Sequence, residues 1–498
     1  MSDAAPRQER MSEGAAVRSR LDHPVIDTDG HFIEIEPILI DYIRDVCGAD
    51  LAGRYREMVG DGRFWAWYHM SPEERRHKRV NRPPFWALPT ANSADRAAAM
   101  IPGAWRARMD EFGIDLTLAY PTICLMLMGI ADDEMRRGFI RAANVMTADL
   151  YRGYEDRIVP AATIPTNTPD EAIEELEFAV NGLGMRLAMV NGIVRRPAGA
   201  ANAGLRAMSA EENSYWVDPL GLDSEYDYDP FWAKCVELGI APTMHSHAIG
   251  LSHRTSISSY NYNHIGHFAD ASEASAKALF LGGVTRRFPE LNVGFLECGV
   301  GWAVALYHGL MEHWEKRNLG AMKANLDPAR IDHRALVEYA ERYGDERIVR
   351  KVRETGSLDG PEYFIQPEDP GDLDEWAACA VRTKQDIHDL FVPCFYFGCE
   401  ADDRGVAWAF DTRVNALGAR LNAMFSSDIG HWDVQDASTV LAEAYELVER
   451  EVVTVDDFRD FTFTNTVRLH GGMNPRFFEG TVIADEAAGL LVQPRAAE

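Results

Sequence analysis

An aspartate and a histidine stand two residues apart at the end of an apolar run near the start of the chain. The segment Val25-Ile26-Asp27-Thr28-Asp29-Gly30-His31 begins as a buried strand, so Asp29 and His31 project to the same side of an extended backbone. Two inward-facing ionisable groups need a compensating charge, and a metal ion supplies one. The alternative is a strand-to-helix turn in which Asp27 or Asp29 caps the helix that starts near Glu34.

Further potential metal ligands follow apolar runs elsewhere in the chain. Short β-rich segments end at His245, Glu297, Glu400 and Asp428. In a barrel of parallel strands, the carboxyl ends of all strands meet on one face. The sequence therefore predicts a metal site formed by Asp29, His31, His245, Glu297, Asp428 and Glu400. Each residue alone also has an ordinary interpretation, such as a helix cap, a buried histidine or a carboxylate paired with arginine.

Histidines gather after the fifth predicted strand. His247 stands two residues after His245, and the loop that follows contains His264 and His267. We expect His264 to act as an acid–base residue, with a loop histidine bonded to backbone as the alternative. His431 directly follows the Asp428 loop and could face the same site.

Strands alternate with helices along most of the chain. β-rich runs are predicted at 24–26, 115–120, 157–164, 185–193, 240–244, 291–296, 391–399 and 421–426, with helical periodicity in between. This alternation indicates βαβ units, and eight such strands predict an α/β fold of the (β/α)8 TIM-barrel type. We expect one barrel over residues 21–480, with insertions near 47–105, 195–229 and 311–390. Residues 1–20 are expected to form a disordered tail, and residues 481–498 a second tail.

The composition excludes several kinds of partner. Among 498 residues, 50 Lys and Arg stand against 78 Asp and Glu, for a net charge of -28. A chain this acidic repels nucleic acid and anionic membranes. No apolar run approaches the roughly 18 residues that span a bilayer, and the first residues lack a secretory signal, so we expect a cytoplasmic protein. The 7 cysteines lack zinc-ribbon spacing and are expected to be reduced, buried thiols.

The chain resembles the amidohydrolase superfamily, in its aminocarboxymuconate-semialdehyde-decarboxylase-like branch. The segments Val25–His31, His245–Gly250, Phe288–Trp302, Phe425–Trp432 and Phe461–Pro475 carry the resemblance. It implies a metal-binding barrel of amidohydrolase type and a homo-oligomer. His245 and Asp428 match the usual ligands of the family on the fifth and eighth strands.

Two positions depart from the family pattern. The usual His-x-His of the first strand is replaced by Asp29 and His31, and the usual histidine of the sixth strand by Glu297. Carboxylates harden the ligand set and move its preference from zinc towards iron or manganese. A carboxylate-rich set also suits two metal ions bridged by carboxylate.

These departures lead us to expect a non-haem monooxygenase with two iron ions as cofactor, and with zinc or manganese as the alternative metals. The expected barrel with its oxygen-rich ligand set is similar to that of a di-iron monooxygenase of this superfamily that hydroxylates a terpenoid thioester. The expected substrate is a small apolar molecule, such as a terpenoid carboxylic acid or CoA thioester, and the expected partner an electron donor. One alternative is a metal-dependent hydrolase or decarboxylase of a carboxylate substrate, in which Asp428 acts as general base. The other is a metal-binding barrel without catalysis.

Overall fold

Eight parallel strands form the centre of the computed structural model, in the order β1-β2-β3-β4-β7-β8-β9-β10. They are β1 (Ile26–Phe32), β2 (Leu116–Pro121), β3 (Ile158–Ile164), β4 (Leu187–Val190), β7 (Pro242–Met244), β8 (Val293–Phe295), β9 (Phe395–Glu400) and β10 (Asn422–Ser426). The structure describes residues 11–60, 66–83, 91–197, 215–325, 330–356 and 373–492. The predicted (β/α)8 barrel is confirmed.

The barrel closes between β1 and β10 through side chains and loop backbone. Asp27 of β1 accepts hydrogen bonds from the backbone N–H of Ser427 (2.9 Å) and from its hydroxyl (2.7 Å). One residue further on, the N–H of Asp428 donates to the carbonyl of Asp29 over 3.1 Å. Because these bonds lie at the carboxyl ends of both strands, they hold the predicted ligands on either side of the seam in register.

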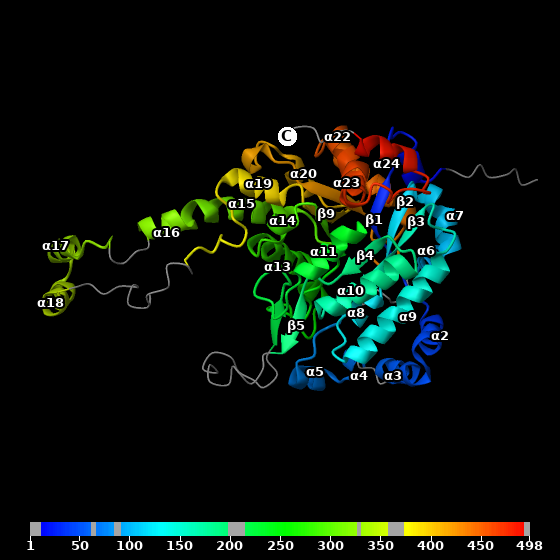
Figure 1. The fold of residues 1–498 in the computed structure, drawn as a ribbon, viewed down its shortest axis with the longest axis horizontal. Helices are drawn as coiled ribbons and strands as arrows, with labels where there is room; N and C mark the ends of the chain where they lie inside the picture. The colour runs from blue at the N-terminus through cyan, green and yellow to red at the C-terminus, as the bar shows by residue number, and fades with distance from the viewer. Residues whose placement is uncertain are drawn as a thin grey trace, which may run out of the picture.

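Helices surround the barrel (Figure 1). Between β1 and β2 lie α2 (Glu36–Cys47), α3 (Ala49–Gly60), α4 (Ala66–His69), α5 (Pro72–Lys78), α6 (Ser93–Met100) and α7 (Pro102–Phe112). The middle of the chain supplies α8 (Cys124–Leu127), α9 (Asp133–Tyr151), α10 (Pro169–Glu177), α11 (Asp229–Leu238), α12 (Tyr260–His264), α13 (His267–Leu281) and α14 (Val284–Arg287). The last third supplies α15 (Gly301–Arg317), α19 (Lys384–Phe391), α20 (Val406–Phe410), α21 (Val440–Glu449), α22 (Val455–Arg459) and α23 (Asn465–Met473).

The helices start where the sequence carries capping signals. Asp132 accepts a hydrogen bond from the N–H of Met135 at the start of α9 (2.9 Å). Thr168 accepts one from the N–H of Glu171 at the start of α10 (3.2 Å), and Pro169 occupies the first turn of that helix. Such caps satisfy N–H groups that a helix leaves without a partner, so they fix the point at which each helix leaves its preceding strand.

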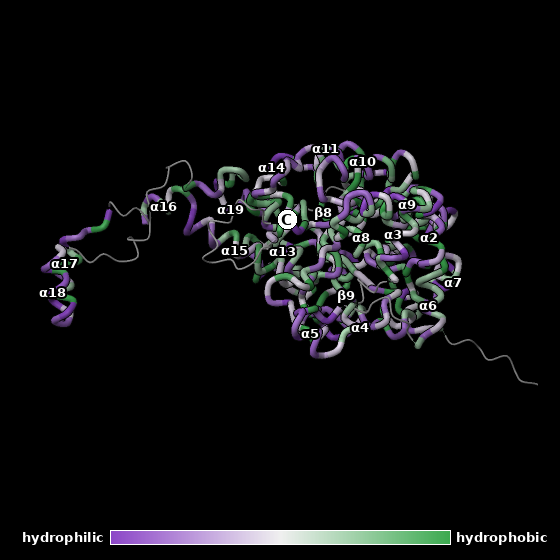
Figure 2. Tube along the Cα trace, turned by 90° about the horizontal axis from the view of Figure 1, so that it is seen from below, coloured by the Kyte–Doolittle hydropathy of each residue, from purple (hydrophilic) through white to green (hydrophobic). Residues whose placement is uncertain are grey.

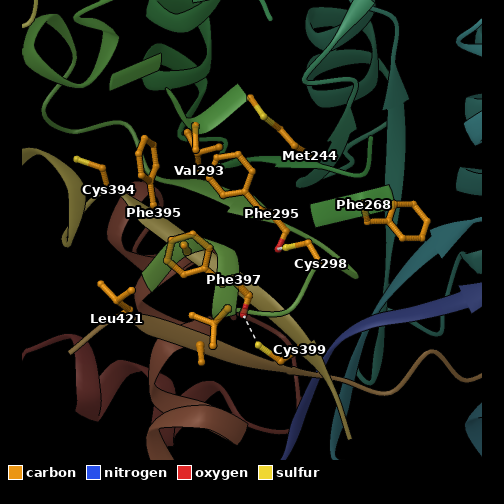
Figure 3. Packing of buried hydrophobic residues seen from close by; sticks show 14 of the residues in the cluster. Met244, Phe268, Val293, Phe295, Cys298, Cys394, Phe395, Phe397, Cys399 and Leu421 are labelled. Atoms are coloured by element: carbon orange, nitrogen blue, oxygen red, sulfur yellow. Dashed lines mark hydrogen bonds between the residues drawn. The ribbon is translucent and has the colours of Figure 1, made fainter. Parts of the chain in front are cut away.

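Aromatic side chains pack between the later strands (Figure 3). The rings of Phe295 and Phe397 are fully buried and stacked, with centroids 5.9 Å apart. Met244 pairs in register with Phe295. Met244 and Phe295 stand just before the segments that carry His245 and Glu297, so their packing holds the ends of β7 and β8 in place.

Two short helices lie in the segments expected to be tails. Residues 13–18 form α1 (Glu13–Arg18), which begins at a Ser12 cap and buries Val17. Near the other end, α24 (Ala484–Leu491) buries Ala487. Short helices owe their stability mainly to tertiary packing, which local composition does not reveal. Residues 1–10 and 493–498 lie outside the described residues.

The expected insertions contain small units of their own. A two-stranded antiparallel hairpin, β5 (Val194–Pro197) with β6 (Tyr215–Asp218), lies in the second. The third contains α16 (Leu319–Asn325), α17 (His333–Tyr343) and α18 (Glu346–Thr355). Parts of the insertions, at 61–65, 84–90, 198–214, 326–329 and 357–372, lie outside the described residues. The division of the chain into barrel and insertions stays a prediction.

Helices α17 and α18 form a hairpin that stands apart from the barrel in both views (Figures 1 and 2). Ala340 and Val352 are buried within this hairpin. Tyr339 and Tyr343, one turn apart on α17, stack on each other and are 63% and 68% exposed. The hairpin is thus an arm that carries apolar side chains away from the main body.

Candidate metal centre

The first strand places an aspartate and a histidine inside the barrel. Asp29 and His31 of β1 are each 1% exposed, and Asp29 Oδ1 lies 3.3 Å from His31 Nε2. Gly30 lies between them because a Cβ atom there would approach Asp27 Oδ2 to 2.6 Å and the Thr117 methyl carbon to 2.7 Å. The strand therefore offers both side chains to the same interior space.

Two further groups come from the ends of β7 and β8. His245 Nε2 lies 3.4 Å from His31 Nε2 and 3.2 Å from Glu297 Oε2. Glu297 has a backbone φ of +50°, a conformation that costs free energy for a residue with a side chain. The strained backbone turns the carboxylate of Glu297 towards the histidines.

The segment after β10 contributes an aspartate and a second histidine. Asp428 Oδ1 lies 3.6 Å from His31 Nε2 and 2.6 Å from His431 Nδ1. The backbone φ of Asp428 is +52°. The ring of His431 stacks on the ring of His31, with centroids 4.1 Å apart. His431 carries no periodic signal in the sequence, since it lies in an irregular turn three residues after Asp428.

These side chains form two overlapping groups able to hold a metal ion. One contains Asp29, His31, His245 and Glu297, and the other contains His31, Glu297, Asp428 and His431. Within each group the ligand atoms lie within 4.8 Å of one another. Both oxygens of Asp29, and Oε2 of Glu297, are buried without a hydrogen-bond partner among the described residues. Because buried charges without partners are costly, this donor set fits a cation.

Burial also sets the protonation of the cluster. It raises the pKa of Asp29 to about 6 and moves the pKa of Glu297 and of Asp428 well above the usual range for carboxyl groups. It lowers the pKa of His31 and of His245 to about 3, so both imidazoles are neutral near pH 7. Neutral imidazoles bind metal ions readily, and a bound divalent cation favours the ionised form of the carboxyl groups.

Two predicted site residues lie outside both groups. Glu400, the last residue of β9, has an exposed side chain. His264 ends α12, and its ring centroid lies 4.8 Å from that of His267. The ring of Phe268 contacts two of these histidines. Its centroid lies 5.0 Å from that of His245 and 6.3 Å from that of His264. The histidines that follow β7 therefore gather beside the cluster without joining it.

A cavity with apolar walls adjoins the cluster. Its lining combines Pro121, Leu125 and Phe268 with His31, His245 and Glu297. Ligand pockets commonly join apolar walls to a few convergent polar groups. The cavity is small, with room for about one water-sized group, so it marks an apolar side of the cluster rather than a formed binding pocket.

The Amidohydrolase family model matches residues 26–349, a range that includes Asp29, His31, His245 and Glu297. The chain belongs to this family. The resemblance inferred from the sequence is thereby confirmed, and the segment with Asp428 and His431 extends the amidohydrolase barrel beyond the matched range.

One curated relative is a gamma-resorcylate decarboxylase from Rhizobium sp. (strain MTP-10005), 26% identical over 205 residues. The match covers 39% of this chain and 54% of the relative, so the chain spans about half the length of this protein. Similar solved structures include a 2,6-dihydroxybenzoate decarboxylase from Rhizobium (17% identity, TM-score 0.44, covering 90% of this chain and 98% of that one). Another is a dihydroxybenzoic acid decarboxylase from Polaromonas sp. JS666 with bound manganese (17% identity, TM-score 0.47, covering 90% and 97%). At these identities the likeness concerns the fold alone.

The comparisons overturn the expected iron monooxygenase. The curated relative is a decarboxylase, which agrees with the alternative that the sequence left open. The carboxylates that suggested oxygen chemistry suit manganese equally well, so they do not single out iron. A buried site able to hold a metal ion is present, but two iron ions are not supported.

The described helices also bear on membrane association. None of them combines the length and the apolar character that crossing a bilayer requires. The expected cytoplasmic location and homo-oligomer stay predictions.

Proposed function

We propose that this amidohydrolase is a metal-dependent decarboxylase of a small aromatic carboxylic acid. The buried cluster of Asp29, His31, His245 and Glu297 carries the proposal, because it provides a cation site at the mouth of the barrel. The decarboxylase activity of the curated relative supports the type of reaction. Pro121, Leu125 and Phe268 line the small cavity beside the cluster, and apolar side chains of this kind pack against aromatic rings.

We propose one divalent cation, manganese, held by Asp29, His31, His245 and Glu297, which form one of the two groups. Metal ligation by Asp428 stays a prediction. A mixed set of carboxylates and imidazoles is harder than the imidazole-rich zinc sites, and this favours manganese over zinc. When bound, the cation acts as a Lewis acid that attracts the oxygen atoms of an anionic substrate. A catalytic contribution of His264 and metal ligation by Glu400 stay predictions.

The protein itself positions the ring and supplies a proton. Asp428 has the most accessible side chain of the cluster, with 11% exposed against 1% for Asp29 and 3% for Glu297. We assign it the proton that replaces the carboxyl group. The bond between the ring carbon and the carboxylate breaks, carbon dioxide leaves, and the electron pair left on the carbon takes the proton from Asp428. This reaction is redox-neutral, so it needs no electron donor.

The test combines metal analysis with a substrate panel. The protein, purified without added metal and then loaded with manganese, is incubated with benzoic acids that carry hydroxyl groups next to the carboxylate. We expect release of carbon dioxide that stops when the metal is removed by a chelator. Hydrolysis of esters or amides without release of carbon dioxide from any acid would overturn the proposal.

A matched pair of variants ties the activity to the cluster. Glu297→Gln removes a buried carboxylate charge, so we expect loss of bound manganese and of carbon dioxide release. Glu290→Gln makes the same substitution at an exposed position before β8 and should retain both. Full manganese content in Glu297→Gln would remove this residue from the ligand set.

A further inference from the structure

We propose that Asp27 is a positioning residue of the metal centre: its carboxylate fixes the backbone of Asp29 and ties it to the turn that carries Asp428. This inference rests on the proposed metal centre and adds to it a residue outside the ligand set. Asp27 is fully buried, yet it belongs to neither group of candidate ligands. Its carboxylate therefore serves a purpose other than binding the metal ion.

A bulge in β1 determines where Asp29 points. From Asp27 to Gly30 the chain advances three residues along β1, while the paired strand β2 advances only two. Thr28 and Asp29 therefore share one position of the ladder. A bulge of this kind turns a side chain away from its regular direction and leaves a backbone group without its partner in the neighbouring strand.

The carboxylate of Asp27 stabilises this bulge. Its Oδ1 accepts a hydrogen bond from the backbone N–H of Asp29 over 3.2 Å. A bond from an aspartate side chain to the N–H two residues ahead favours a bent backbone over a regular strand. The other role considered for Asp27, capping the next helix, is not seen, because α2 starts after Ile35 without a side-chain cap. The direction of the Asp29 side chain thus depends on Asp27.

The same carboxylate reaches across the seam of the barrel. Besides its bonds to the N–H and hydroxyl of Ser427, the Ser427 oxygen accepts the N–H of Ile429 over 3.1 Å. Asp428 lies between these two residues, and its own N–H donates to the carbonyl of Asp29. Asp27 therefore holds the proposed ligand Asp29 and the proposed proton donor Asp428 in one hydrogen-bonded unit.

The two aspartates of β1 use their oxygens differently. The oxygens of Asp27 accept three hydrogen bonds from the protein. Both oxygens of Asp29 are buried without a hydrogen-bond partner among the described residues. Because a buried carboxylate needs donors or a cation, the protein stabilises Asp27, and Asp29 suits a metal ion. Partners that hold a ligand in place are typical of metal sites.

Metal affinity tests the role of Asp27. The full chain is freed of metal with a chelator and titrated with Mn²⁺ in a calorimeter. We expect Asp27→Ala to bind at least about tenfold more weakly than the wild type, the loss usual for the partner of a metal ligand. Asp27→Asn keeps an oxygen for the N–H of Asp29, so it should restore most of the affinity. Wild-type affinity in Asp27→Ala, or an asparagine variant as weak as the alanine variant, would overturn the proposal.

Thr28→Val is the matched control. The Thr28 hydroxyl also crosses the seam, where it donates to the carbonyl of Phe425, but it does not bond to Asp29. Valine replaces this hydroxyl by a methyl group. The variant should unfold at a lower urea concentration than the wild type and keep its affinity for Mn²⁺. A loss of affinity equal to that of Asp27→Ala would show that any damage to the seam weakens the site, and would overturn the specific role of Asp27.

Hydrogen exchange of the metal-free protein tests the bulge without the metal. The peptide that contains β1 should take up deuterium faster in Asp27→Ala than in the wild type, because the N–H of Asp29 loses its acceptor. Equal exchange would overturn the proposal. If the Asp27 variants behave as expected and no acid loses carbon dioxide, only the proposed reaction is refuted.

Discussion

Glu297 and Asp428 share an unusual backbone conformation. Their φ angles are +50° and +52°, in the left-handed region that side chains other than glycine rarely adopt. Both residues follow a short strand of the barrel and turn their carboxylates into the cluster. Backbone strain of this kind persists where the surroundings impose it, and it is common at functional sites.

The strain at Glu297 can be measured by comparing two variants that both lack the carboxylate. Glycine tolerates a positive φ, whereas alanine does not, so the metal-free Glu297→Gly protein should be about 1 kcal/mol more stable than Glu297→Ala. Urea unfolding in the presence of a chelator measures the difference. An alanine variant as stable as the glycine variant would mean that residue 297 relaxes out of this conformation.

The pH dependence of metal binding follows from Asp29. Its pKa is raised to about 6 by burial, so below that pH the side chain holds a proton that a metal ion must displace. We expect the rise in melting temperature caused by Mn²⁺ to be small near pH 5 and to grow as the pH increases through about 6 to 7.5. Differential scanning calorimetry of loaded and metal-free samples tests this. A shift that is constant over this range would exclude Asp29 as a ligand.

Metal-free protein should show the opposite trend for its buried aspartates. Burial raises the pKa of Asp27 to about 7 and that of Asp29 to about 6, from 3.8 in both cases. Such groups contribute stability that is fully present below the unfolded pKa and is lost as the pH rises through the folded pKa. Without metal, the free energy of unfolding should therefore fall as the pH rises from about 4 to 7. A bound cation should stabilise the protein most at neutral pH, where both carboxyl groups would otherwise be buried as unpaired charges.

The sequence predicts where the strands end, but not how deeply the side chains at those ends are buried. Asp29, His31, His245, Glu297 and Asp428 follow apolar runs, and the structure brings all of them together. Glu400 follows such a run as well, yet its side chain is exposed. The sequence does not show how far the last residue of a strand is covered, because its exposure depends on the loops around the end of the barrel. Metal ligation by Glu400 stays a prediction.

At the level of elements, β1 determines the geometry of the cluster. Gly30 gives the strand room beside Asp27 and Thr117, and any Cβ atom there would lie within 2.7 Å of both side chains. We expect Gly30→Ala to destabilise the protein by about 1–3 kcal/mol, as overpacking does, and to weaken metal binding. Gly53→Ala in α3, where a Cβ atom meets nothing within 4 Å, should be neutral or stabilising. Equal unfolding midpoints for the two variants would contradict this view of β1.

The barrel strands were predictable for a physical reason. Most are fully buried, so they appear in the sequence as short apolar runs that end at proline or at an ionisable residue. The hairpin of β5 and β6 and the pair α17–α18 were not predicted, because neither sits within the regular alternation of strand and helix. His431 was noticed only as a neighbour of Asp428, since irregular turns carry no periodic signal.

On the scale of the whole molecule, the α17–α18 hairpin is separate from the cluster of candidate metal ligands. It buries Ala340 and Val352 within itself and stands apart from the barrel in Figures 1 and 2. Replacement of residues 331–356 by a short flexible linker should therefore leave the manganese content unchanged and shift the melting temperature by less than about 3 °C. A larger shift would show that the hairpin contacts the barrel of its own chain or of another.

The same arm changes how the protein moves through water. A projecting hairpin adds much friction for little mass, so this chain should diffuse more slowly than a compact sphere of 498 residues. On a gel-filtration column it should elute early and mimic a larger particle. Light scattering, which reports mass independently of shape, then distinguishes an elongated single chain from a true assembly of copies.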